Sequence, residues 1–434
     1  MAKEIQNLWR EVRELSLGTK IDRLDSPPSP LKFLRDYVSQ SKPCVISNAI
    51  SHWPALKLWS DPAYLAGALS DDVVSLHLTP NGCADAVTED RDLCFASAHV
   101  EKVLFPEALK AVQSSCKGQK VGYLQQQNDC FRTEYSMVAL DCDGEIDWAT
   151  EAFGCSPEAV NLWIGTDDSV TSFHKDHYEN LYAVVSGEKH FLLLPPTDVH
   201  RLYIEQYPAA NYSYHRDTEV FKLEIEEPVR HVPWSSVDPY PSPEKEASER
   251  LKYPLFFNGP KPFHCTVKAG EVLYLPSMWF HHVSQTPGDG GYTIAVNYWY
   301  DMQFDIKYAY FNFLQSLSYK SSTLNPVLSW REDKDSESSD AERKSDKNSG
   351  TGSMVNFFSG VPNRTLKPRS FKQIPFPKTQ NPPLSNVISS ESKYMLLDSD
   401  ILGLMDCLSS PGTEDLYTSL AQESTETCDC CWGL

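Results

Sequence analysis

The sequence between residues 161 and 196 reads NLWIGTDDSVTSFHKDHYENLYAVVSGEKHFLLLPP. Short runs of β-branched and aromatic residues alternate there with Gly, Asp and Pro turn signals, and the pattern returns after residue 262. This pattern predicts strands at residues 161–165, 169–174, 181–186, 190–194, 263–267, 271–275, 281–285 and 293–299. Gly187 is expected to form a hairpin turn between two of them. Short strands at such spacing favour an antiparallel sandwich or barrel.

A His-x-Asp pattern, formed by His174 and Asp176, lies within this stretch. If the segment is a strand, the two side chains point to the same face, because residues i and i+2 do so. An imidazole and a carboxylate are two of the three protein ligands in the 2-His-1-carboxylate site of non-heme Fe(II) oxygenases. Taken alone, the pattern is more typical of a polar pair on a solvated strand face.

The sequence offers candidates for the rest of such a site. His281 and His282 begin a later predicted strand, and distant strands of a jelly roll can adjoin at the barrel mouth. Because they are adjacent, only one of them can face a site. Lys189 precedes an apolar run and is a candidate to hold an anionic cosubstrate. The alternative for Lys189 is a solvated lysine at a hairpin.

Composition limits the functional classes. The chain has 39 Lys and Arg against 59 Asp and Glu, a net charge of −20, which argues against direct nucleic-acid binding. An acidic chain suits a basic protein partner, although simple solubility explains the charge as well. We find no signal peptide and no membrane span. The 12 Cys are scattered, so we expect a reducing compartment, cytoplasmic and/or nuclear.

The sequence divides into three parts. Residues 1–30 are predicted to form a helix followed by a proline-rich segment. Residues 31–320 are predicted to form the main domain, in which residues 197–262 have little periodicity and are interpreted as an insertion. Residues 331–434 are rich in Ser, Asp, Glu, Lys and Pro, which predicts a low-complexity, largely disordered C-terminal tail.

Two flanking helices are expected to use apolar faces. The N-terminal helix has its helically spaced apolar residues at Leu8, Val12 and Leu15. The second helix, at residues 305–318, has a longer apolar stripe, formed by Ile306, Tyr310, Phe313 and Leu317. This second stripe fits either packing on the chain's own barrel or a homodimer interface.

Four segments resemble the JmjC (cupin-8-like) 2-oxoglutarate oxygenases, namely residues 174–182, 186–191, 275–282 and 295–301. The resemblance extends over about residues 28–316 and is strongest to the small JmjC-only lysyl hydroxylases and their plant relatives. It implies a mainly β fold, with a double-stranded β-helix (jelly-roll or cupin) core and flanking helices. The C-terminal tail lies outside it.

The resemblance implies roles for individual residues. His174, Asp176 and His281 match the Fe(II) ligands, with His281 chosen because the family's ligand directly follows a Trp-aromatic pair. The cosubstrates implied are 2-oxoglutarate and O₂. Five positions match residues that bind 2-oxoglutarate, namely Tyr123, Thr171, Asn180, Lys189 and Asn297. Trp299 matches a residue of a secondary pocket.

Three functions are open at this point. The resemblance implies a protein lysyl hydroxylase acting on a target lysine, with GTPases of the developmentally regulated GTP-binding class as substrates. A histone methyl-lysine demethylase would use the same chemistry, but the sequence shows no histone-reader module. A non-enzymatic cupin-like binding scaffold is the third. The sequence indicates no substrate-binding residue.

Overall fold

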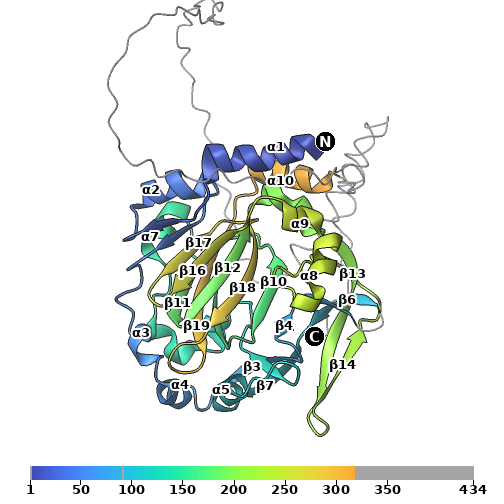
Figure 1. Ribbon diagram of the computed structural model, residues 1–434. Coiled ribbons are helices and arrows are strands. Elements are labelled where there is room, and N and C mark those ends of the chain that lie inside the picture. The colour runs from blue at the N-terminus through green and yellow to red at the C-terminus, as the bar shows by residue number, and fades with distance from the viewer. Residues whose placement is uncertain (1, 90–91, 318–434) are drawn as a thin grey trace, which may run out of the picture. The chain divides into compact units, whose positions relative to one another are not determined.

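Two sheets pack face to face to form the centre of the molecule (Figure 1). The computed structural model describes residues 2–89 and 92–317, so the predicted tail at 331–434 lies outside the described residues. The major sheet contains, in spatial order, β1 (Asp22–Leu24), β2 (Cys44–Ile46), β17 (Val272–Leu275), β11 (Tyr178–Ser186), β19 (Thr293–Asp301) and β9 (Ala159–Gly165). The minor sheet contains β16 (Phe263–Lys268), β12 (Glu188–Leu194), β18 (Phe280–Thr286), β10 (Val170–His174) and β4 (Cys83–Ala84).

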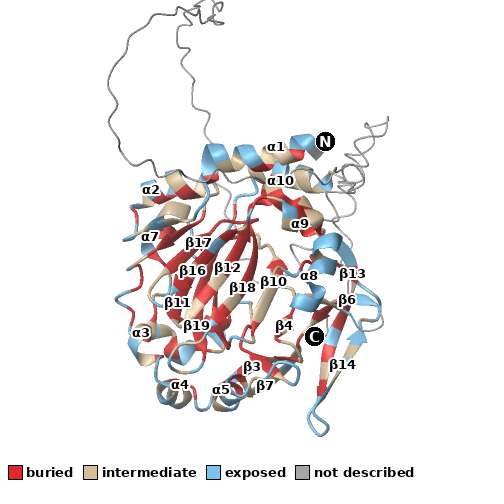
Figure 2. Ribbon diagram, viewed as in Figure 1, coloured by how far each residue is buried: buried red, intermediate tan, exposed pale blue. Residues whose placement is uncertain are grey.

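The chain alternates between these sheets from β9 to β12 and again from β16 to β19. β9, β11, β17 and β19 lie in the major sheet, while β10, β12, β16 and β18 lie in the minor one. Apolar side chains from both sheets meet in one buried cluster, which includes Tyr182, Phe191 and Leu273. In Figure 2 much of the ribbon of the two sheets is coloured as buried. The mainly β jelly-roll, or cupin, fold is therefore confirmed, and each barrel strand predicted above corresponds to an observed strand.

The prediction of a hairpin at Gly187 was wrong. β11 pairs with β17 and β19, whereas β12 pairs with β16 and β18, so the chain crosses between sheets at this point. Gly187 has a φ of +73°, and a Cβ there would lie 2.5 Å from the carbonyl oxygen of Thr286. Glycine is therefore required by backbone conformation and by close packing.

The expectation that Asp176 lies on the same strand as His174 was also wrong. β10 ends at His174, and Asp176 lies in the connection to β11. The backbone N–H of Met278 donates a 2.9 Å hydrogen bond to the carbonyl of Asp176, which fixes this connection against the loop before β18.

Helices cover the outer face of the major sheet. They are α2 (Pro30–Phe33), α3 (Ala55–Leu58), α4 (Pro62–Ala68), α5 (Phe105–Gln113), α6 (Cys130–Thr133) and α7 (Asp147–Phe153), with a π-helical turn η2 (Leu34–Val38) and a 3-10 turn η3 (Ser136–Asp141). Phe33 is fully buried and contacts Tyr274 of β17 edge to face, with 4.8 Å between ring centroids. A small sheet of β7 (His99–Leu104), β3 (Val73–Thr79) and β8 (Val121–Tyr123) lies beside them.

Residues 197–262, interpreted above as an insertion because their sequence shows little periodicity, contain regular structure. They include most of the 3-10 helix η4 (Pro196–Leu202), and then β13 (Glu205–His215), β14 (Val220–Ile225), β15 (His231–Trp234), α8 (Pro243–Lys252) and α9 (Pro254–Asn258). β13, β14 and β15 join β5 (Ala86–Glu89) and β6 (Leu93–Ser97) in a further sheet, which we call the arm sheet. Its strands come from two distant parts of the chain, so no local pattern marks it as one unit.

The flanking helices form where predicted, but they use other faces. α1 (Ala2–Val12), followed by a π-helical turn η1 (Arg13–Leu17), buries Ile5 and Trp9 against Leu255, while Leu15 is 84% exposed. In α10 (Ile306–Ser316) Tyr308 is buried. Three residues of the predicted stripe are exposed instead, namely Ile306, Tyr310 and Phe313. That stripe does not pack on the barrel, and the homodimer stays a prediction.

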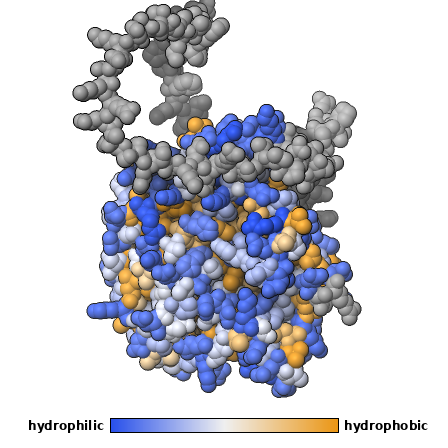
Figure 3. Space-filling model, viewed as in Figure 1, coloured by the Kyte–Doolittle hydropathy of each residue, from blue (hydrophilic) through white to orange (hydrophobic). Residues whose placement is uncertain are grey.

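The surface in view is mostly hydrophilic. Figure 3 shows hydrophilic residues over most of this face, with small hydrophobic patches between them. Within the described ranges, no helix combines the length and the apolar character needed to cross a membrane.

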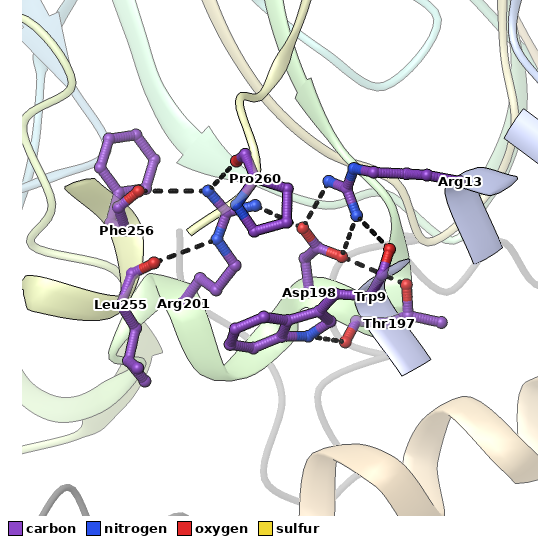
Figure 4. A network of polar contacts seen from close by, with 8 residues as sticks. All are labelled: Trp9, Arg13, Thr197, Asp198, Arg201, Leu255, Phe256 and Pro260. Carbon is purple, nitrogen blue, oxygen red and sulfur yellow. Dashed lines mark hydrogen bonds and ion pairs between the residues drawn. The ribbon is translucent and has the colours of Figure 1, made fainter. Parts of the chain in front are cut away.

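A buried ionic network attaches α1 to the domain (Figure 4). The fully buried Asp198 carboxylate accepts hydrogen bonds from Arg13, at 2.8 and 3.2 Å, and from the fully buried Arg201. Arg201 also donates to three backbone carbonyls, and the Trp9 indole donates to that of Thr197 at 2.9 Å. The charges are therefore matched by hydrogen-bond partners, as buried ions require.

This network predicts a large stability effect. Asp198→Asn keeps the shape of the side chain but leaves two guanidinium groups without their counterion, so we expect the free energy of unfolding to fall by about 3–5 kcal/mol. Urea denaturation followed by circular dichroism measures the change. Glu246→Gln is the control, because Glu246 and Arg250 pair at 2.9 Å with both side chains half exposed; it should cost less than about 1 kcal/mol. Equal small losses in both variants would contradict this account.

Candidate functional site

Three predicted ligands meet where β10 ends and β18 begins. One donor atom from each of His174, Asp176 and His281 lies within 4.8 Å of the others. The Asp176 carboxylate is 3.5 Å from Nε2 of His281 and 3.9 Å from Nε2 of His174. Neighbouring donors on an octahedral cation with bonds of about 2.1 Å lie about 3 Å apart. The cluster therefore fits one cation with small side-chain adjustments, and its two imidazoles and one carboxylate suit Fe(II).

Backbone register brings the two histidines together. β10 and β18 are antiparallel, and His174 lies directly opposite His281, with 4.0 Å between the ring centroids. Asp176 reaches the same point from the connection after β10. Each ligand is thus carried by, or follows directly on, a strand of the rigid minor sheet.

Backbone carbonyls orient both imidazole rings. Nδ1 of His174 donates to the carbonyl of Ser172 at 2.9 Å, and Nδ1 of His281 donates to that of Trp279 at 3.0 Å. Because a carbonyl oxygen only accepts, each Nδ1 carries the proton and each Nε2 keeps a lone pair. Burial, followed by the proximity of His174, lowers the pKa of His281 well below its usual value, which favours the neutral, metal-binding form.

His282 does not join the cluster. Its ring lies between Phe173 and Tyr240, with centroid distances of 5.5 and 5.7 Å, on the opposite face of the minor sheet. Burial lowers the pKa of His282 to about 4. The geometry therefore brings only His281 of this adjacent pair to His174 and Asp176.

Lys189 is a buried cation inside the barrel. It lies in β12 and is only 1% exposed, so it is not the solvated lysine considered above. Its Nζ donates to the Tyr123 hydroxyl at 3.1 Å and lies over the Tyr123 and Tyr182 rings. Burial lowers the pKa of Lys189 to about 7, and no carboxylate among residues 2–89 and 92–317 pairs with it. A buried ammonium without a counterion fits the carboxylate of a ligand.

Tyr123 and Thr171 lie beside this cation. Tyr123 reaches the barrel interior from β8, outside the two main sheets. Burial raises the pKa of Tyr123, and a side-chain hydrogen bond with Thr171 opposes part of that rise. The phenol is therefore neutral, and Tyr123, Thr171 and Lys189 form one polar group in an apolar interior.

Asn180 and Asn297 form a second polar group. Asn297 donates from Nδ2 to Oδ1 of Asn180 at 3.2 Å and accepts a 2.8 Å hydrogen bond from the Trp163 indole. The Trp163 ring lies 6.1 Å from that of Tyr123, so the two polar groups adjoin. Trp163 was not predicted, because one aromatic residue in an apolar strand is typical of core packing.

Trp299 lies apart from Lys189. It is opposite Asn180 in the major sheet, and its ring stacks on Tyr178 at 4.8 Å. Its buried indole N–H has no acceptor in the part of the chain that is described. Its place in a secondary pocket stays a prediction.

Trp234 was also not predicted. This residue ends β15 of the arm sheet, and its ring lies nearly parallel to that of His174, at 6.2 Å and 8°. It falls in the segment where the sequence shows little periodicity, and no motif indicates its position near the ligand cluster.

Residues 30–306 match the family described as Cupin-like domain. The chain is 93% identical over 342 residues to Lysine-specific demethylase JMJ32 of Arabidopsis thaliana, covering 79% of this chain and 99% of that protein. It is 42% identical over 315 residues to the human Bifunctional peptidase and (3S)-lysyl hydroxylase JMJD7, covering 73% and 95%. JmjC domain-containing protein E of Dictyostelium discoideum is 39% identical over 327 residues, covering 71% and 91%. The chain therefore belongs to the cupin-like JmjC family of 2-oxoglutarate-dependent oxygenases.

Proposed function

We propose that this protein uses Fe(II), 2-oxoglutarate and O₂ to hydroxylate a lysine side chain of a protein substrate. The observation that carries the proposal is the presence, in one barrel, of a 2-His-1-carboxylate cluster and a buried ammonium without a counterion. A cupin-like scaffold that binds neither a metal ion nor an anionic cosubstrate would gain nothing from a buried, unpaired lysine in the same barrel as such a cluster, because burying an unpaired cation is costly.

His174, Asp176 and His281 would hold the iron through two Nε2 atoms and one carboxylate. Bound there, Fe(II) supplies the oxidative decarboxylation of 2-oxoglutarate to succinate and CO₂, with insertion of one oxygen atom into a substrate C–H bond. The hydrogen bonds from both Nδ1 atoms keep the two rings oriented, so little reorganisation is needed when the metal binds.

The polar groups inside the barrel would bind the cosubstrate. Lys189 would pair with the distal carboxylate of 2-oxoglutarate, and the hydroxyls of Tyr123 and Thr171 would donate hydrogen bonds to it. Asn180 and Asn297 would face the same molecule from the major sheet. Apolar side chains around these residues exclude water, which strengthens each of these interactions.

The lysine specificity rests on the named relatives. Lysyl hydroxylation, as in the name of the human relative, would place the oxygen on a side-chain carbon. A second candidate is demethylation, favoured by the 93% identity to the Arabidopsis protein named as a lysine-specific demethylase. In that reaction an N-methyl carbon is hydroxylated, and the product releases formaldehyde and leaves the lysine amine. Both outcomes need the same ligands and the same cosubstrate.

Mass spectrometry of substrate peptides separates the two outcomes. Lysine peptides from GTPases of the developmentally regulated GTP-binding class should gain about 16 mass units per turnover by hydroxylation, whereas methyl-lysine histone peptides would lose about 14 by demethylation. We expect the gain on unmethylated lysine, and the same peptides with Arg in place of the lysine are the control. Loss of mass with formaldehyde release, and no gain, would assign demethylation instead.

The ligand assignment predicts different results for two adjacent histidines. His281→Ala should abolish Mn(II) binding, measured by calorimetry, and succinate formation with Fe(II), as should His174→Ala. His282→Ala is the matched control, because it removes a buried imidazole next to the site without removing a ligand. We expect it to keep metal affinity within about threefold of the unsubstituted protein, whatever it costs in stability. Succinate formation that survives in His174→Ala would contradict the iron site.

The proposed carboxylate partner of Lys189 predicts a pH dependence. The pKa of Lys189, about 7 without ligand, means that the ammonium form is present below pH 7 and is lost as pH rises. The affinity for 2-oxoglutarate should therefore fall above pH 7, by up to about tenfold per pH unit. Calorimetry with Mn(II) in place of iron measures it from about pH 6 to pH 9.

Lys189→Met should weaken 2-oxoglutarate binding more than about tenfold and remove this pH dependence, because it keeps the length of the side chain and deletes the charge. Lys268→Met, at an exposed lysine, is the control and should behave as the unsubstituted protein. Unchanged affinity in Lys189→Met would place the carboxylate elsewhere.

A further inference from the structure

The His174 ring has two aromatic neighbours. The ring centroid of His281 on β18 is 4.0 Å from that of His174 on β10, and the centroid of Trp234 on β15 is 6.2 Å from that of His174. The first two residues are proposed ligands, while the third comes from the arm sheet. The face of Trp234 is nearly parallel to the His174 ring, with 8° between the planes.

His174 lies at the end of β10, beyond the part of this strand that pairs with β4. On one side β10 pairs with β18, where the register shifts between Thr171 and His174. On the other side β4 pairs with Val170 and Thr171, and no described strand pairs with His174 there. The backbone at His174 therefore has fewer strand partners than that at His281, which lies between β10 and β12.

Trp234 takes the place of the missing strand neighbour. Its indole N–H donates to Oγ of Ser172 at 2.9 Å, and this Oγ donates in turn to the carbonyl of Asp85 at 2.8 Å. The carbonyl of Ser172 accepts a hydrogen bond from Nδ1 of His174. One serine therefore connects three segments, because its side chain is held by Trp234 and Asp85 while its backbone orients the ligand ring.

The arm sheet holds Trp234 firmly in this position. The Trp234 ring packs on Phe95 of β6, with 4.8 Å between centroids, and adjoins a cluster that includes Tyr207 and Val232. β6 and β13 pair in parallel, which joins residues 95–97 to residues 209–211 across the chain. The arm sheet thus presents a rigid indole to the end of β10.

We infer that Trp234 is a positioning residue that, through Ser172, fixes the orientation of His174 as a metal ligand. This inference rests on the proposed function, because it requires His174 to bind the metal. Residues that hydrogen-bond the groups around metal ligands typically change metal affinity by about 10–100-fold when they are substituted. The arm sheet then has a role in the oxygenase site, since it supports the ligand that has fewer strand partners.

Co(II) binding to the full-length protein tests the inference. Co(II) is a spectroscopic substitute for Fe(II), and its visible absorption reports ligand geometry independently of turnover. Trp234→Phe keeps an aromatic ring against Phe95 but removes the indole donor. Ser172→Ala removes the hydroxyl relay but keeps the carbonyl that holds His174. We expect both variants to bind Co(II) several-fold to about tenfold more weakly and with altered visible spectra, and Trp234→Ala to lose about tenfold or more.

Trp53→Phe is the matched control. The Trp53 indole donates to Asp143 at 2.9 Å, far in sequence from the ligands, so this variant should lose stability without any change in Co(II) affinity or spectrum. If Trp234 only stabilised the fold, Trp234→Phe would also lose stability without any change in Co(II) affinity or spectrum. If Trp234→Ala does not fold, Trp234→Phe and Ser172→Ala decide the question.

The outcomes separate the inference from the proposed function. If His174→Ala binds Co(II) as the unsubstituted protein does, the proposed metal centre is wrong. If His174→Ala loses Co(II) binding while Trp234→Phe and Ser172→Ala keep the affinity and spectrum of the unsubstituted protein, the metal centre stands and the positioning role is overturned.

Discussion

The antiparallel register between β10 and β18 is the constraint on which the site depends. It places His174 opposite His281, and the short connection after His174 then brings Asp176 to both. Because side chains alternate along a strand, a slip of one residue would turn His281 to the outer face and bring His282 inward. Both faces of the minor sheet are packed, by the barrel interior on one side and by Phe173 and its neighbours on the other, so such a slip is strongly disfavoured.

Two kinds of buried charge in this fold show how a functional ion differs from a structural one. Arg201 is fully buried, but it has Asp198 and three carbonyls as partners, so the folded protein alone satisfies it. Lys189 is equally buried and has a phenol as its hydrogen-bond partner, and burial lowers its pKa to about 7. Removing Asp198 would leave Arg201 as an unpaired buried charge. The protonated Lys189 is already an unpaired buried charge before any ligand binds. The barrel therefore holds Lys189 in a state that an anion stabilises.

Local pattern was sufficient for the barrel strands, but not for how strands are assigned to sheets. It drew attention to His174, Asp176 and the adjacent pair His281 and His282, whereas the choice of His281 came from the family resemblance. Gly187 carries an ordinary turn signal, yet whether the chain turns back or crosses depends on partners such as Thr286, more than ninety residues away. The face of α1 was mispredicted for a similar reason, because Trp9 is buried by Leu255 and Thr197 rather than by its own neighbours. Lys189 was a candidate from its place before an apolar run, Asn297 was identified only through family resemblance, and neither Trp163 nor Trp234 was predicted. Residues whose roles depend on distant partners were therefore the ones that local pattern missed.

The ligand cluster is supported from outside the barrel on two sides. On the His174 side, the arm sheet contributes Trp234. On the Asp176 side, the backbone N–H of Met278 holds the Asp176 carbonyl, and Met278 packs with Met302 and Tyr308 of the α10 region. The barrel supplies the three candidate ligands and Lys189, while elements outside it hold the segments that carry His174 and Asp176. Substitutions in the arm sheet or in α10 are therefore expected to change metal affinity through ligand geometry, even though these elements contribute none of the three donors.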